Sequence, residues 1–186
     1  MMGEYAVSAQ RGRLCPVVLG FAFAQLPGAV RLAHESASLM RGTVTVERGT
    51  SLLSRVAGFF AGMPKACMHG PCEVRFEQLH NGERWVRDMN GSRFVSTLTA
   101  AAEPACFDES FGWYGFRFRI DADEGSAHFS LVRHTVCGIP VPKLFWPQVR
   151  TVESEVNGSY RFEVEARMAN GELLVRYVGA LAPVEG

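Results

Sequence analysis

The chain has 186 residues, of which 47% are hydrophobic and 20% are charged, values typical of one soluble globular domain. A chain of this length buries about 70% of the surface that its unfolded form exposes. Lys plus Arg equals Asp plus Glu, at 19 each, and the two signs are interleaved. The sequence therefore has no basic field to attract nucleic acid or an anionic membrane, and no apolar run approaches the ~20 residues of a membrane span.

Cysteine usage indicates a reducing compartment. None of the five cysteines forms a Cys-x-x-Cys pair, and only His69 lies near the closest two, so the spacing does not suit zinc. An odd number of thiols without a disulfide framework predicts a cytoplasmic protein, without metal or cofactor. One thiol remains an alternative nucleophile, although no motif indicates which of them it is: Cys15, Cys67, Cys72, Cys106 or Cys137.

The start of the chain has two interpretations. We predict a flexible segment over residues 1–18 and a single cavity domain over residues 19–183. Leu14–Ala24 also resembles the apolar part of a signal peptide. However, Pro16 interrupts this run, and helical spacing continues beyond it to Ala33. We therefore interpret it as part of the domain, and a signal peptide remains the alternative.

The next part of the chain predicts helices and one strand. Leu19–Ser38 has helical spacing, which Pro27-Gly28 divides in two, and Gly42–Arg48 alternates as a strand. Ser51–Gly62 then predicts a helix with a Thr or Ser cap. We expect this helix to pack across the opening of the sheet through its large apolar residues, Leu52, Val56, Phe59 and Phe60.

From residue 72 onward the chain is a succession of predicted antiparallel strands. Asn-Gly turns, which tolerate positive φ angles, separate several of them. A loop around Pro104 and a proline-rich connector over 139–147 are expected to lie outside the central strands. The strands are predicted over 72–79, 83–89, 93–99, 113–121, 127–136, 148–156 and 160–168, followed by a last strand from Leu173.

The alternation in the last hairpin predicts which side chains face the core. Phe162, Val164 and Val175 should point inward, whereas Glu163 and Glu165 should point to water. A set of about nine such strands rarely stays flat. The sequence therefore predicts a mainly β (α+β) domain, with a strongly curved antiparallel sheet or half-barrel, two or three short N-terminal helices and an apolar cavity.

Several short sequence motifs, taken in their order along the chain, resemble the bacterial family called domain of unknown function 4166. The resemblance runs from about residue 19 to residue 183 and implies one continuous domain, without implying an activity. Members of the family can follow an oxidoreductase-like domain within one polypeptide. The phrases are Leu26-Pro27…Val30…His34, Gly42-x-Val44-x-Val46-x-Arg48-Gly49, Gly62-x-Pro64, Glu83-x-Trp85-x-Arg87, Glu109…Gly112, Gly138-Ile139-Pro140-x-Pro142…Trp146-Pro147 and Arg176-Tyr177-x-Gly179-x-Leu181-x-Pro183.

Arg87 is the first candidate for the site. It lies two residues from Trp85 on a predicted strand, so both side chains share one face. A buried guanidinium needs an acidic partner, and the candidates are Glu109, Glu153 and Glu155. Such a pair either anchors an anionic group of a ligand or serves as a structural ion pair that closes the barrel, and a third reading places both residues on a solvated face. The sequence leaves these readings open.

Two further residues are candidates for acid–base chemistry. Glu109 lies among aromatic residues, which disfavour its charged form, although it also suits a polar loop. His34 ends the first helical stripe and is either a proton carrier or a structural histidine. Two other histidines, His128 and His134, are expected to share one face of a strand. Other aromatic residues are predicted to bind the ligand: Trp85, Trp113, Tyr114, Tyr177 and Trp146.

Two functions follow. The first is a cofactor-independent acid–base enzyme, such as a cyclase, isomerase or dehydratase, which acts on an apolar small molecule through Glu109, His34 and Arg87. The alternative is a non-catalytic domain that carries such a ligand or assists a partner enzyme or a second copy of the chain. Convergence of the three side chains on one cavity favours the enzyme, and their dispersal on the outer surface favours the alternative. Esterase, phosphate-loop and dinucleotide motifs are absent from the sequence.

Overall fold

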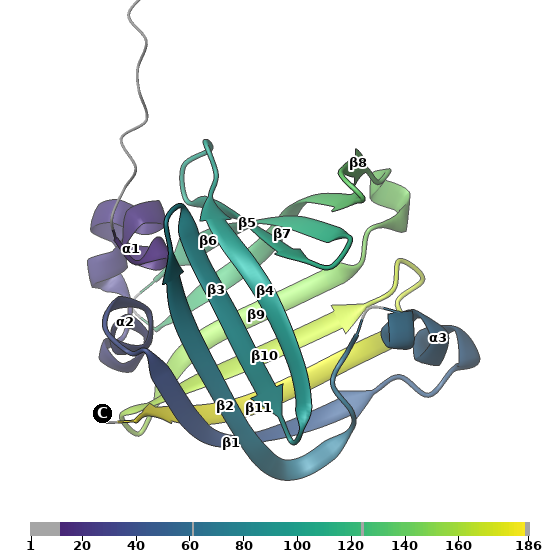
Figure 1. Cartoon of the computed structure of the whole chain (residues 1–186), viewed down its shortest axis with the longest axis horizontal. Coiled ribbons are helices and arrows are strands. Elements are labelled where there is room, and N and C mark those ends of the chain that lie inside the picture. The colour runs from purple at the N-terminus through teal and green to yellow at the C-terminus, as the bar shows by residue number, and fades with distance from the viewer. Residues whose placement is uncertain (1–11, 61, 124, 185–186) are drawn as a thin grey trace, which may run out of the picture.

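The protein is a closed antiparallel β-barrel with helices at both ends (Figure 1). The computed structural model describes residues 12–60, 62–123 and 125–184. Ten strands form the barrel and the short β8 pairs outside it with β7. The strands are β1 (Leu39–Arg48), β2 (Cys67–Leu79), β3 (Gly82–Met89), β4 (Ser92–Ala100), β5 (Cys106–Phe111), β6 (Tyr114–Ala122), β7 (Ser126–Val136), β8 (Ile139–Pro140), β9 (Gln148–Val156), β10 (Ser159–Arg167) and β11 (Leu173–Pro183).

The prediction of a half-barrel with about nine strands was wrong in two respects. The region after Pro104, predicted as a loop, contains β5, which pairs with β4 and β6. In addition, β6 pairs with β7 along its whole length, and β7 also pairs with β9, so the sheet closes. Closure depends on hydrogen bonds between strands and on their stagger, neither of which the alternation of side chains records.

The register of the last hairpin confirms the prediction for this part of the chain. Phe162 and Val175 are buried and line the interior, and Val164 lines it as well. On the outer face, Glu163 and Glu165 remain partly exposed and form ion pairs with arginines. Because side chains in a strand alternate with a period of two, this hairpin has only one register that buries its apolar set.

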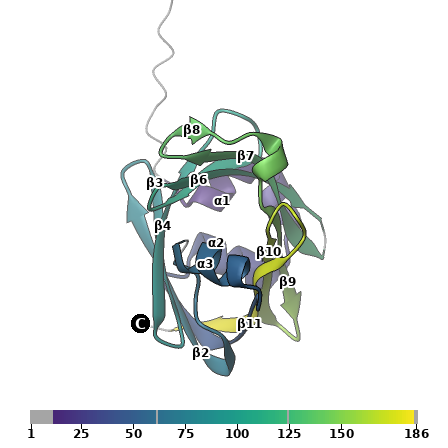
Figure 2. The ribbon, with the colours of Figure 1, turned by 90° about the vertical axis from the view of Figure 1, so that its right-hand side faces the viewer.

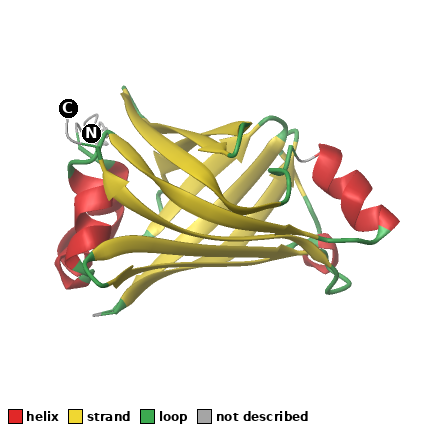
Figure 3. Ribbon diagram, turned by 90° about the horizontal axis from the view of Figure 1, so that it is seen from below, coloured by secondary structure: helices red, strands yellow, loops and turns green. Residues whose placement is uncertain are grey.

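One end of the barrel is covered by the N-terminal helices. They are α1 (Leu14–Leu19), the 3₁₀ helix η1 (Gly20–Gln25) and α2 (Gly28–Glu35). Figure 3 shows them at the end of the barrel opposite helix α3 (Leu52–Phe60). Val30 and Ala33 on α2 are fully buried. We call this end the plugged end. None of the described helices is long and apolar enough to cross a membrane.

The predicted boundary between a flexible segment and the domain falls within α1. Leu14 and Cys15, on the N-terminal side of that boundary, are buried against the barrel. Residues 1–11 lie outside the described part of the chain. For those residues the predicted flexibility stays a prediction.

The opposite end is open, and α3 (Leu52–Phe60) lies across part of the opening (Figure 2). A helix was predicted at this place, but the prediction that its large apolar residues pack against the barrel was wrong. Leu52, Val56 and Phe59 are exposed, and the side chain of Phe60 lies outside the described part. The buried positions of α3 are small instead: Ser54 is buried and bonds the carbonyl of Leu173, and Gly58 lies against Arg48.

Candidate functional site

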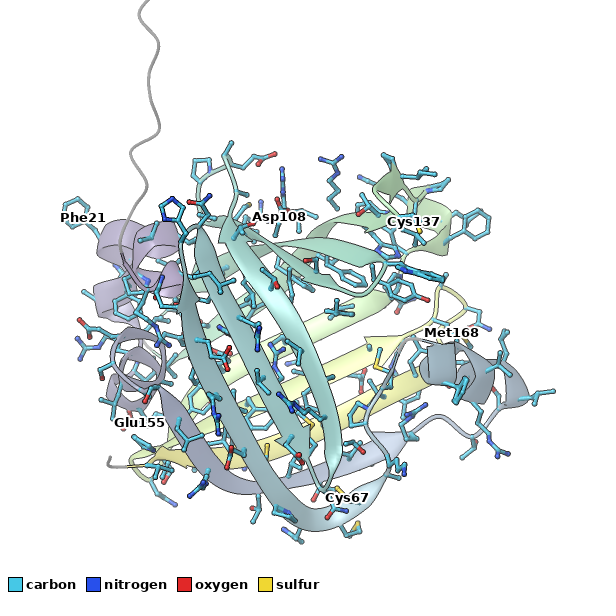
Figure 4. The ribbon with its side chains drawn as sticks, viewed as in Figure 1. Phe21, Cys67, Asp108, Cys137, Glu155 and Met168 are labelled. Carbon is cyan, nitrogen blue, oxygen red and sulfur yellow. The ribbon has the colours of Figure 1, made fainter. Side chains whose placement is uncertain are left out.

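The interior of the barrel holds a cavity of about 1070 Å³. Its wall is mainly aromatic and aliphatic, and the loops of the open end contribute to it, whereas the helices of the plugged end do not. In Figure 4, Met168, one of the lining residues, lies beside α3 at this open end. A cavity of this size and composition suits a small molecule that is largely apolar.

Arg87 and Glu109 form an ion pair on the cavity wall. Arg87 Nη2 lies 3.1 Å from Glu109 Oε1, and Arg87 Nη1 donates a hydrogen bond of 2.7 Å to Ser96 Oγ. Both charged side chains are 13% exposed. The guanidinium also lies over the rings of Trp85 and Phe94, at 4.8 and 5.1 Å from their centroids. The predicted acidic partner of Arg87 is thus Glu109 rather than Glu153 or Glu155.

His34 lies behind the cavity wall. It is buried on α2, and its Nε2 lies 2.6 Å from Glu153 Oε2. Glu153 itself lines the cavity, as does Tyr160, whose ring centroid lies 6.2 Å from that of His34. Of the three side chains predicted as catalytic, two therefore reach the cavity directly, whereas His34 lies behind the wall and contacts the lining residues Glu153, Trp85 and Tyr160.

Glu83 connects the wall of the cavity to the plugged end, although it is not among the site residues predicted from the sequence. Its carboxylate is buried and accepts hydrogen bonds from the Trp85 indole, at 2.7 Å, and from the Leu14 amide, at 2.8 Å. Arg13 Nε lies 2.9 Å from the same carboxylate. Glu83 thereby orients Trp85 and fixes the start of α1, which is a structural role.

A β-bulge in β7 changes which histidine faces the interior. Arg117 pairs with Arg133 while Phe118 pairs with Leu131, so Val132 is an extra residue on β7. As a result His134 is buried on the cavity wall and stacks on Phe116 at 4.5 Å, whereas His128 lies on the outer face. The prediction that the two histidines share one face of the strand was wrong, because the bulge reverses the inward and outward alternation of side chains beyond it.

The aromatic residues predicted as ligand-binding fall into two groups. Four of them line the cavity: Trp85, Trp113, Tyr114 and Tyr177. Trp146 instead donates its indole N–H to the carbonyl of Val141, at 2.6 Å, and its neighbours Phe145 and Pro147 take the lining positions. Their role in binding stays a prediction.

Burial raises the pKa of two of the tyrosines on the cavity wall, Tyr160 and Tyr177. Desolvation raises the pKa of Tyr177 to about 12. Desolvation also raises the pKa of Tyr160 well above its ordinary value, with the nearby Glu153 carboxylate adding to the shift. Both hydroxyl groups therefore remain protonated at neutral pH and can donate hydrogen bonds to a ligand or to Glu153.

The described residues do not bring three His, Cys, Asp or Glu side chains together as a metal site would require. The five thiols are all unbridged, and Cys137 is the exposed one among them. The polar groups on the cavity wall are carboxylates, the guanidinium groups of Arg87 and Arg93, the imidazole of His134, two indole N–H groups and several hydroxyls.

Comparison with known proteins gives a family without assigning a function. No curated protein and no solved structure matches the chain. The family model described as domain of unknown function (DUF4166) matches residues 28–181, from the start of α2 into β11. The matched region contains the barrel except for the last two residues of β11, together with α2 and its His34, and the Arg87–Glu109 pair. The chain therefore belongs to the DUF4166 family.

Proposed function

We propose that the chain binds one elongated, largely apolar small molecule inside the barrel, with the polar end of the ligand held at Arg87 and Glu109. The observation that carries the proposal is the position of this ion pair on the wall of an otherwise apolar cavity of about 1070 Å³. A few fixed polar groups in an apolar pocket orient a ligand, and the apolar wall supplies most of the affinity.

The charges at the site favour an uncharged polar group on the ligand. Glu109 already neutralises Arg87, and Glu153 adds a second carboxylate to the same wall, whereas the other lining cation, Arg93, is exposed to solvent. A ligand carboxylate would face both acids, whereas a carbonyl or hydroxyl oxygen can accept from Arg87 or from Tyr177 without adding charge. We therefore expect an apolar alcohol or ketone, such as a polyene alcohol or a polyketide, in preference to a fatty acid.

Titration with Nile red, an apolar uncharged dye with a carbonyl group, tests this proposal. We expect one dye per chain, with a blue-shifted emission. Val164→Trp, which fills part of the cavity, should weaken binding at least tenfold, because the wall and the dye would compete for the same space. The matched control, Glu163→Gln, changes the outward-facing neighbour on β10 and should bind like the wild type. Equal affinity in both variants, with retained circular dichroism, would place the dye outside the barrel and refute the proposal.

The second candidate function is acid–base catalysis on the bound ligand. The observation that favours it is the His34–Glu153 contact of 2.6 Å, which connects a buried imidazole to the cavity wall. In this hypothesis Glu109 or Glu153 removes a proton next to a ligand carbonyl, and the neighbouring hydroxyl groups stabilise the developing enolate.

Deuterium exchange separates catalysis from binding. The probe is β-ionone, an apolar enone, incubated with the protein in D₂O and analysed by mass spectrometry. We expect the wild type to accelerate exchange, and Glu109→Gln or Glu153→Gln to lower the rate by about 10²–10⁴-fold while Nile red still binds. Exchange at the rate of the protein-free control would reject the enzyme and leave the binding function in place.

A further inference from the structure

Helix α3, at the open end of the barrel, turns its small residues toward the barrel and its large apolar residues toward solvent. On α3 the small residues Ser54 and Gly58 face the barrel, and the large apolar residues Leu52, Leu53 and Val56 face outward. Leu52 is 77% exposed and Leu53 is 59% exposed. A helix that served only to cover the opening would turn its large apolar side inward, because burial of a leucine side chain is strongly favourable.

A second apolar segment lies at the same end. The connector between β8 and β9 contains the 3₁₀ helix η2 (Lys143–Phe145), and the β5–β6 turn adds a further aromatic residue. Leu144 is 78% exposed and Trp113 is 77% exposed. We call the following exposed set the mouth rim: Leu52, Leu53, Val56, Trp113, Ile139, Leu144 and Phe145. Because Trp113 and Phe145 also line the cavity, the mouth rim is continuous with the apolar interior.

The charges around the mouth rim are mainly positive. Four cations are exposed at this end: Arg55 on α3, Lys65 in the loop after it, Arg93 at the start of β4 and Lys143 on η2. Against these four cations, the described segments 49–60, 62–66, 88–93, 111–113, 137–147 and 168–172 contain two acidic residues: Asp88, which accepts a hydrogen bond from the Gly91 amide, and Glu172. The Glu172 carboxylate accepts a hydrogen bond from Ser51 at the start of α3. Although the whole chain is neutral, this end therefore presents a local excess of positive charge.

We propose that the mouth rim docks on the surface of a lipid bilayer that contains anionic lipids. Exposed leucine and aromatic side chains beside lysine and arginine are the combination that binds the interface of such a bilayer, with the apolar groups below the headgroups and the cations among them. In this orientation the cavity opens toward the bilayer, so that an apolar molecule can pass between the two without crossing water. The proposal goes beyond ligand binding, and vesicle binding is measured without any ligand.

Cosedimentation of the full chain with vesicles tests the apolar contribution. The probes are vesicles of dioleoyl phosphatidylcholine with 30 mol% dioleoyl phosphatidylglycerol, and vesicles of phosphatidylcholine alone. We expect stronger binding to the anionic vesicles. Leu53→Gln together with Leu144→Gln should weaken this binding at least tenfold, because both side chains leave the apolar layer. The matched control, Phe21→Ser together with Leu32→Gln, changes exposed apolar residues at the plugged end (Figure 4 shows Phe21 there) and should bind like the wild type.

A second pair of variants tests the charges. Arg55→Gln with Lys143→Gln should weaken binding to the anionic vesicles by about 25-fold, since each cation near the surface contributes about fivefold. Arg31→Gln with Arg161→Gln removes the same charge from exposed positions at the plugged end and on β10, and should have little effect. High salt should reduce the binding of the wild type.

Three outcomes would overturn the proposal. One is failure of the wild type to sediment with the anionic vesicles, and another is an equal loss in the rim and control variants. The third is a concentration-dependent dimer in solution that Leu53→Gln with Leu144→Gln abolishes while vesicle binding is unaffected, because the mouth rim would then be a contact between two copies of the chain.

Discussion

Arg87 shows how single residues connect the stability of the barrel to its candidate site. Its guanidinium is held by Ser96 and Glu109 and lies over Trp85, so the fold satisfies the charge even without a ligand. Trp85 in turn is held by Glu83, which also fixes the start of α1. The side chains that would bind a ligand are thus oriented in advance by contacts within the protein.

Removal of the Arg87 side chain should destabilise the protein because it leaves Glu109 without its partner in an apolar wall. We expect Arg87→Ala to lower the free energy of unfolding by about 2–4 kcal/mol, as measured by urea denaturation. The control is Arg84→Ala, which breaks the exposed Arg84–Glu77 pair on the outer face and should cost less than about 1 kcal/mol.

A double substitution identifies the cause of that loss. Arg87→Met with Glu109→Leu removes both charges, so most of the stability should return. If the double variant were no more stable than Arg87→Ala, the packing of the guanidinium on the rings of Trp85 and Phe94, and not its charge, would be the main contribution.

At the scale of elements, α3 is positioned by small residues and by one arginine. Arg48 Nη1 donates to the carbonyls of Met63, at 3.0 Å, and Pro64, at 2.9 Å, and its guanidinium lies against Gly58. This arrangement fixes the loop that follows α3 at the open end of the barrel. It also accounts for the glycine in the helix, since a side chain there would meet the guanidinium.

Substitution of Gly58 should therefore loosen α3 without unfolding the barrel. A Cβ atom on Gly58→Ala would collide with the Arg48 guanidinium and displace it from its two carbonyls. We expect trypsin to cut at Arg55 or Lys65 at least tenfold faster, while the urea midpoint changes little, because local opening requires fewer contacts to break than global unfolding.

The matched control for this helix is Gly28→Ala at the start of α2. The nearest atom to a Cβ there is Glu155 Oε2, at 3.5 Å, which is an ordinary contact. This variant should be cut like the wild type. Equal cleavage of the two variants would show that the Arg48 contacts do not hold α3 in place.

At the scale of the whole molecule, the barrel buries groups that ionise only in alkali. Desolvation raises the pKa of Tyr177 and that of Cys72 to about 12, and it also raises the pKa of Tyr160 and of Cys15. In the unfolded chain these groups lose their protons near pH 9–10. Above that pH the unfolded state binds fewer protons than the folded state, so stability must fall as the pH rises.

This dependence predicts a measurable effect of Tyr177. Between pH 10 and pH 12 the wild type should lose stability through this residue, reaching about 1.4 kcal/mol at pH 11. Urea denaturation at pH 7 and pH 11 should therefore show a smaller decrease for Tyr177→Phe than for the wild type. An equal decrease in the two proteins would show that the Tyr177 hydroxyl is hydrated in the folded state.

The sequence by itself determined most strands, the register of β10 and β11, and the pairing of Arg87 with an acid. These features follow from local alternation and from the cost of burying a charge, and both can be read from residue order. It also predicted five aromatic residues as ligand-binding. The structure places four of them, Trp85, Trp113, Tyr114 and Tyr177, on the cavity wall but not Trp146, and their binding role stays a prediction.

Only the tertiary structure decided the remaining features, because they depend on contacts between segments far apart in the chain. β5 is too short and polar for its alternation to be recognised, and closure requires the stagger of all ten strands. The bulge at Val132 exchanges the faces of two histidines, and the contact of His34 with Glu153 joins a helix to a distant strand. The outward side of α3 is likewise fixed by Arg48 and Leu173, since helical spacing alone cannot tell which side of a helix meets the barrel.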